Sequence, residues 1–180
     1  MSDDIDIDFV VMNLVGRDGV SLEAADLILE RIKEGKTIPM FFYGTLRVGG
    51  GNDVHFLGGI KKTKKNVQAP GVLYFPGHNM FPGARFDEEG TMAGDLFWYK
   101  ADATDLMGIF RMEISAGYTA EVIEVTYERK TERPRRKTIK AISFQYEGRS
   151  LGALSRSRDD WEPVPGNDWF CSAARRMRGA

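Results

Sequence analysis

The first hydrophobic pattern along the chain is that of a helix over about residues 21–34. Its apolar side chains recur at helical spacing and give it one hydrophobic face: Leu22, Leu27, Ile28 and Ile32. Ser21 stands where an N-cap is expected, and Gly35 follows a last turn that carries basic side chains. Before Val20, acidic and apolar residues alternate, which is typical of a short strand or an ordered tail.

From Thr37 onward the pattern changes to short apolar runs with strand-like alternation. We expect strands at 38–43, 72–75, 91–99, 121–128 and 138–146, and one further helix at about 102–114. The charged runs 61–65 and 130–137 are most simply solvated connections. Strands outnumber helices, and short turns join them. The predicted fold is therefore α+β: a small, mainly antiparallel β-barrel or strongly curved sheet with one or two packed helices.

Composition limits the class of protein further. A chain of 180 residues with 42% hydrophobic residues can form one substantial domain with a real core. We expect an N-terminal extension at 1–36, the domain at 37–150, and a tail at 151–180 that packs on it. A net charge of -1 argues against a general nucleic-acid binder. A single cysteine, no signal-peptide pattern and no apolar run of membrane-spanning length favour a cytoplasmic protein.

The first candidate for chemistry is the loop that begins at Tyr43, Gly44, Thr45 and Leu46. An apolar strand runs directly into it, and several glycines and Asn52 follow. Successive backbone N–H groups in such a loop can form a concave site for a carboxylate or phosphate. The spacing fits neither a Walker A loop nor a Rossmann loop. On composition alone, a flexible hairpin loop remains the alternative.

The second candidate is Glu113. If the helix begins after an N-cap at Asp102, its apolar stripe is Leu106, Ile109 and Phe110, and residue 113 comes next on that face. Burial and the negative end of the helix dipole would both raise the pKa of this carboxyl group. A raised pKa suits proton exchange near neutral pH. The alternative is a helix that frays early, which would leave the glutamate in water.

Other reactive side chains carry weaker signals. His55 and His78 stand in turn-rich contexts and are expected at the surface. Ser155 and Cys171 lack any setting typical of a nucleophile. With so few histidines and cysteines, we expect no metal site and no cofactor.

In their order and separation, the two candidates resemble the gamma-glutamylcyclotransferase-like family. Residues 41–47 resemble its Tyr-Gly-Thr/Ser-Leu signature, and Asn52 resembles the asparagine that follows it. The runs 69–74 and 94–99 resemble the family's Pro-Gly-Leu-Tyr and Gly-Glu-Val-Tyr strands. Leu106 to Glu113, followed by Tyr118, resembles the segment that carries the family's catalytic glutamate. The resemblance covers about residues 38–146.

The resemblance implies a small mixed β-barrel with a cavity. In it, the signature loop would bind the α-carboxylate of a small γ-glutamyl substrate, and Tyr118 would line the site. Glu113 would act as general acid and base in a cyclisation that releases 5-oxoproline and an amine without a metal or nucleotide. Three positions depart from the family pattern, Ile114, Thr119 and Ala120. They keep open a binding domain that has lost the reaction. A further alternative is that the same fold processes a γ-glutamyl group on a larger substrate, such as a modified metabolite or a protein side chain.

Overall fold

The structure is a computed structural model, and it describes residues 14, 17–51, 56, 58–75, 81–101, 104–129, 135–146 and 161–170. Several residues named above lie outside these ranges: Asn52, His55, His78, Asp102, Ser155 and Cys171. Their expected roles stay predictions. Within the described ranges, no helix has the length and apolar character that crossing a membrane requires.

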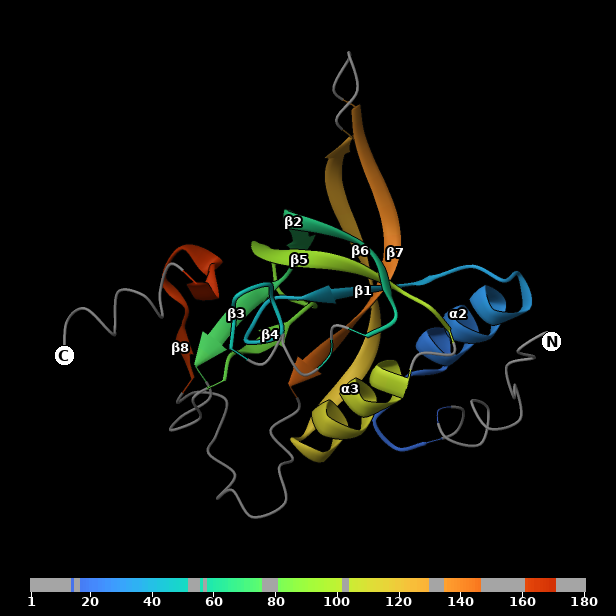
Figure 1. Cartoon of the computed structure of the whole chain (residues 1–180). Helices are drawn as coiled ribbons and strands as arrows, with labels where there is room; N and C mark the ends of the chain where they lie inside the picture. Colours follow the sequence, from blue (N-terminus) through green and yellow to red (C-terminus); the bar gives the residue numbers. More distant parts are fainter. Residues whose placement is uncertain are drawn as a thin grey trace.

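Five strands form a closed barrel in the order β1-β5-β2-β6-β7 (Figure 1). Their bounds are β1 Ile38–Phe42, β2 Ile60–Pro70, β5 Thr91–Tyr99, β6 Tyr118–Arg129 and β7 Arg135–Tyr146. All neighbouring strands run antiparallel except β1 and β7, which pair in parallel and close the barrel. The prediction of a small mixed, mainly antiparallel barrel in an α+β protein is confirmed.

A small second sheet joins the barrel to the C-terminal part of the described chain. It consists of β4 (Gly83–Arg85), β3 (Val72–Phe75) and β8 (Glu162–Pro163), in that order. A short 3-10 helix, η3 (Pro165–Asn167), follows. The Asn167 side chain accepts a hydrogen bond from the Leu73 N–H (2.6 Å) and donates to the Gly71 and Thr91 carbonyls (2.9 and 2.8 Å). Residues 161–170 are thus fastened to β3 by backbone pairing, and to the start of β5 in the barrel by this side chain.

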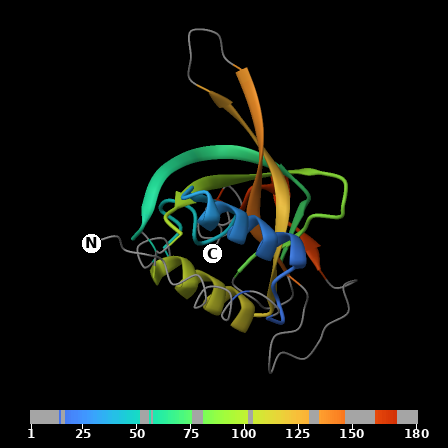
Figure 2. The same ribbon diagram turned by 90° about the vertical axis from the view of Figure 1, so that its right-hand side faces the viewer.

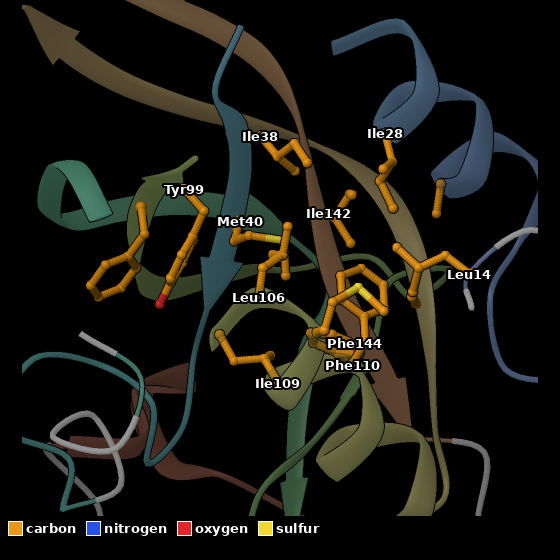
Figure 3. Packing of buried hydrophobic residues seen from close by; sticks show 14 of the residues in the cluster. Leu14, Ile28, Ile38, Met40, Tyr99, Leu106, Ile109, Phe110, Ile142 and Phe144 are labelled. Atoms are coloured by element: carbon orange, nitrogen blue, oxygen red, sulfur yellow. The ribbon is translucent and has the colours of Figure 1, made fainter. Parts of the chain in front are cut away.

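The helix α2 (Leu22–Lys33) begins as the sequence predicts. The hydroxyl group of Ser21 accepts a hydrogen bond from the Ala24 N–H at 3.2 Å, which satisfies a donor that the helix itself leaves free. The helix lies across one side of the barrel (Figure 2). Its apolar face packs into a core with β1, β5, β7 and α3 (Thr104–Ser115), except for Leu22, which was expected on that face and is 79% exposed. Figure 3 shows Ile28, Ile142 and Phe110 in that core.

The helix α3 covers the neighbouring part of the same core. Its predicted stripe is confirmed, because Leu106, Ile109 and Phe110 are almost fully buried. Arg111 lies off that stripe and is exposed. The barrel, α2 and α3 therefore share one hydrophobic cluster.

The predictions for the two charged runs were wrong, the first over 61–65 and the second over 135–137; residues 130–134 lie outside the described ranges. Residues 61–65, expected in a solvated loop, belong to β2, which pairs with β5 over most of its length. Residues 135–137 belong to β7, and the β6–β7 hairpin projects beyond the barrel (Figure 1). In both places backbone pairing continues where nearly all side chains are exposed, so the sequence carries no hydrophobic alternation that would show a strand.

Candidate active site

A pocket of about 130 Å³ opens at one end of the barrel, where β1 and β7 end and β6 begins. Its walls come from the loop after β1, the last turn of α3, the start of β6 and the segment Phe81–Pro82. One water needs roughly 10–15 Å³ of comparable space, so the pocket can hold a ligand the size of an amino acid. Phe41, Phe42 and Phe144 form its apolar lining on the side of the barrel.

All six residues that the sequence nominates line this one pocket: Tyr43, Gly44, Thr45, Leu46, Glu113 and Tyr118. The loop and the glutamate are about 70 residues apart in the chain, and they meet because β1 and α3 end at the same side of the barrel. The fold therefore brings the loop and Glu113 into one pocket, as the family resemblance implies.

The loop after β1 turns sharply at the pocket wall. The Arg47 N–H donates to the Gly44 carbonyl at 3.1 Å, and the Gly50 N–H donates to the Arg47 carbonyl at 2.8 Å. Within the described part of the chain, the N–H groups of Gly44 and Leu46 have no hydrogen-bond partner. Unpaired backbone donors beside a pocket are ready to bind an anionic or carbonyl oxygen.

A side chain that the sequence did not nominate, Arg47, holds this loop in place. It is only 2% exposed. Its guanidinium donates to Asp168 at 2.8 Å and to the Asn66 side chain at 3.0 Å, and its Nε lies 3.5 Å from the buried carboxylate of Asp95. The Asp95 carboxylate also accepts the Val48 N–H at 3.0 Å. An arginine directly after the loop signature was visible in the sequence, but its partners come from three distant segments.

Glu113 lies in the last turn of α3, partly buried, and lines the pocket. Burial raises the pKa of its carboxyl group to about 8, because the charged form loses hydration there. Among the described residues that line the pocket there is no lysine, arginine or histidine that would oppose this shift. Near neutral pH the group can therefore both release and take up a proton, as general acid-base catalysis requires.

Two tyrosines face Glu113 from the barrel. The Tyr43 hydroxyl donates to the Phe144 carbonyl, and the Tyr118 hydroxyl donates to the Pro82 carbonyl at 2.9 Å. Burial raises the pKa of both phenols well above the usual value, and the proximity of Glu113 raises them further. Both side chains therefore stay neutral and fix the pocket walls through their hydrogen bonds.

Within the described residues, no three acidic, histidine or cysteine side chains gather closely enough to hold a metal ion. The pocket thus offers one titratable carboxyl group, two unpaired backbone donors and an apolar lining. This arrangement can orient a small molecule with a carboxylate and transfer a proton to or from a neighbouring group.

The chain is similar to a known protein family and to several solved structures. The model of a family described as gamma-glutamyl cyclotransferase, AIG2-like, matches residues 40–170. None of the curated protein sequences compared with the chain matches it. Among solved structures, an uncharacterized protein from Pyrococcus horikoshii is similar, with 19% identity, a TM-score of 0.51, and coverage of 79% of this chain and 98% of that one.

Two further solved structures are similar. YkqA from Bacillus subtilis has 17% identity and a TM-score of 0.51; the match covers 79% of this chain and 43% of that one. An AIG2-like protein from Mus musculus has 12% identity and a TM-score of 0.48, and the match covers 69% and 82% of the two chains. At these identities the likeness to the Pyrococcus horikoshii and Bacillus subtilis proteins shows the fold alone.

Proposed function

Because the chain belongs to the gamma-glutamyl cyclotransferase, AIG2-like family, we propose that it cyclises a small γ-glutamyl compound to 5-oxoproline and a free amine. One observation carries the proposal. Glu113, with a pKa of about 8, lies in the same pocket as the loop from Tyr43 to Leu46. The family membership supports a cyclotransferase in general; the substrate class, the mechanism and the residue roles are our proposal.

In the proposed reaction, the Glu113 carboxylate takes a proton from the α-ammonium group of the substrate. The neutral α-nitrogen attacks the γ-carbonyl carbon and forms the new C–N bond of the lactam ring. The bond from that carbon to the leaving nitrogen then breaks, and Glu113 returns its proton to this nitrogen. The α-nitrogen loses a second proton as the lactam forms, and the released amine takes it up to become an ammonium ion.

The rest of the pocket would orient the substrate. The free N–H groups of Gly44 and Leu46 would bind the α-carboxylate, which places the α-amine near both Glu113 and the γ-carbonyl. Holding two reacting groups of one molecule close together and correctly oriented lowers the activation free energy substantially. The enzyme then needs to supply little more than one well-placed proton carrier, which contributes on the order of a hundredfold or more.

A panel of γ-glutamyl compounds, assayed for 5-oxoproline by mass spectrometry, tests the proposal. The wild-type protein should release 5-oxoproline from at least one of them. Glu113→Gln should fold normally, still bind that compound, and lose activity by roughly a hundredfold or more. Glu124→Gln, a change of an exposed glutamate on β6, is the matched control and should keep its activity.

Near-wild-type release of 5-oxoproline by Glu113→Gln would exclude the mechanism. Thermal stabilisation by a compound that is never turned over would favour the alternative, a binding domain of the same fold.

A further inference from the structure

A part of the chain that precedes the family match touches the proposed site. The match begins at residue 40, whereas the turn Arg17–Val20 lies against the start of β6. The Ala120 N–H donates to the Gly19 carbonyl at 2.8 Å, and the Ser21 N–H donates to the Ala120 carbonyl at 3.0 Å. These two bonds clamp the turn to Ala120, which is completely buried.

The contact continues onto the end of α3 through Gly19. A Cβ atom at this position would lie 2.9 Å from Cγ2 of Ile114 and 3.5 Å from the Tyr118 carbonyl oxygen. Its φ of +90° is also one that side chains disfavour. Only glycine therefore allows this turn to approach so closely. Ile114 directly follows Glu113, so the contact reaches both the neighbour of Glu113 and the backbone of Tyr118, two residues that line the pocket.

The position of this contact matters because helix ends fray. Glu113 lies in the last turn of α3, where its own carbonyl group and that of Ile114 accept hydrogen bonds from the N–H groups of residues 116 and 117, just beyond the helix (3.1 and 3.0 Å). These bonds are the last of the helix, so a contact that packs against the turn adds to what holds its side chains in place. Ile114 and Ala120, two of the three departures from the family pattern, are the residues that the turn Arg17–Val20 contacts.

We propose that the turn Arg17–Val20 is a positioning element of the pocket: by packing Gly19 against Ile114 and binding Ala120, it fixes the end of α3 and thereby the place of the Glu113 side chain. The functional consequence rests on the proposed cyclotransferase activity. The geometric part concerns the location of Glu113 alone and can be tested without turnover.

The proton affinity of Glu113 reports on that location. The titratable groups that face it are the phenols of Tyr43 and Tyr118, and no other titratable side chain lies among the described residues of the lining. The pKa of about 8 arises from burial. A looser helix end would let water reach the carboxyl group and lower its pKa toward the ordinary value.

The test compares Gly19→Ala with a matched control, Gly35→Ala. Both glycines have positive φ, +90° and +62°, so both substitutions strain the backbone, but a Cβ at Gly35 has nothing within 4 Å. The pKa of Glu113 is measured by NMR titration of its side-chain carboxyl carbon, assigned by the signal that Glu113→Gln removes. Gly19→Ala should lower this pKa by about one unit or more, and Gly35→Ala should leave it unchanged.

Ile114→Ala removes the same contact from the other side and should shift the pKa of Glu113 in the same direction. It provides the test if Gly19→Ala does not fold. In the cyclisation assay, Gly19→Ala should reduce kcat roughly tenfold and move the pH profile downward with the pKa. An unchanged pKa in both folded variants, or an equal shift in Gly35→Ala, overturns the proposal. If the wild-type protein releases no 5-oxoproline, the proposed function is wrong. The NMR titration still tests the positioning role of the turn, because it does not depend on turnover.

Discussion

The buried carboxyl group of Glu113 makes the stability of the protein depend on pH. Its pKa is about 8 in the folded protein, against an ordinary value of 4.5 in the unfolded chain. Between these values the folded state holds one proton more than the unfolded state. Stability therefore falls as the pH rises, by at most about 1.4 kcal/mol per pH unit from this group.

Glu113→Gln removes this loss, because its amide stays neutral. We expect the variant to gain stability over the wild type as the pH rises from about 5 to 8, and the difference to level off above 8. Urea denaturation of both proteins at several pH values measures it, and other titrating groups cancel in the difference. A difference that stays constant across this range would mean that Glu113 ionises normally in the folded protein.

At the residue scale, the sequence predicted which side chains meet but not how they are held. Helical spacing alone placed position 113 on the stripe of Leu106 and Phe110, because a period of 3.6 residues fixes direction without knowledge of the partner. The carbonyl group of Pro82, to which Tyr118 donates, could not be predicted. That bond depends on how a loop and a strand far apart in the chain come together, and no local pattern records it.

At the scale of elements, Arg47 links the loop after β1 to the C-terminal segment. Besides its bond to Asp168, its guanidinium lies 4.5 Å from the centre of the Phe170 ring. Replacing it would leave the 2%-exposed carboxylate of Asp95 without its cation. An uncompensated buried charge typically costs several kcal/mol, whereas an exposed ion pair contributes less than about 1 kcal/mol.

Arg47→Met should therefore lower the free energy of unfolding by roughly 3–5 kcal/mol. The control is Lys140→Met, which breaks the ion pair with Glu23 at the same 2.8 Å distance but with both side chains more than half exposed. It should change stability by less than about 1 kcal/mol. Urea denaturation compares them, and equal losses in the two variants would show that the Arg47 network contributes no more than a surface pair.

Strands of four or more residues with a buried face could be predicted, and strands without one could not; β4 is buried but has only three residues, too few to show a pattern, and was missed. β1, β3 and β5 were recognised because their side chains are largely buried. β2 was missed because its first half carries Lys61, Lys62 and Lys65 in solvent. The backbone of β5 pairs with residues 62–64 of this half, and Lys62 packs over the Trp98 ring at 4.6 Å. Pairing to a neighbour overrides local propensity there.

At the scale of the whole molecule, the helix α2 is built into the same core as the barrel, although it precedes the family match. Ile28 is 1% exposed and packs with residues of β1, β7 and α3 (Figure 3). A helix that shared no core with the barrel would unfold separately from it. Because the core is common, we expect α2 and the barrel to unfold in one cooperative transition.

The three tryptophans allow a direct test, since Trp98, Trp161 and Trp169 all lie outside residues 1–36. Ile28→Ala should destabilise the protein by about 2–5 kcal/mol, through lost burial and the cavity it leaves. The whole loss should appear in the tryptophan fluorescence transition, coincident with the circular dichroism transition. Leu22→Ala, on the same helix but 79% exposed, should change neither. If Ile28→Ala altered the circular dichroism transition and left the fluorescence transition in place, α2 would be an independently unfolding appendage, and the adjoining turn Arg17–Val20 could not hold Glu113 in place.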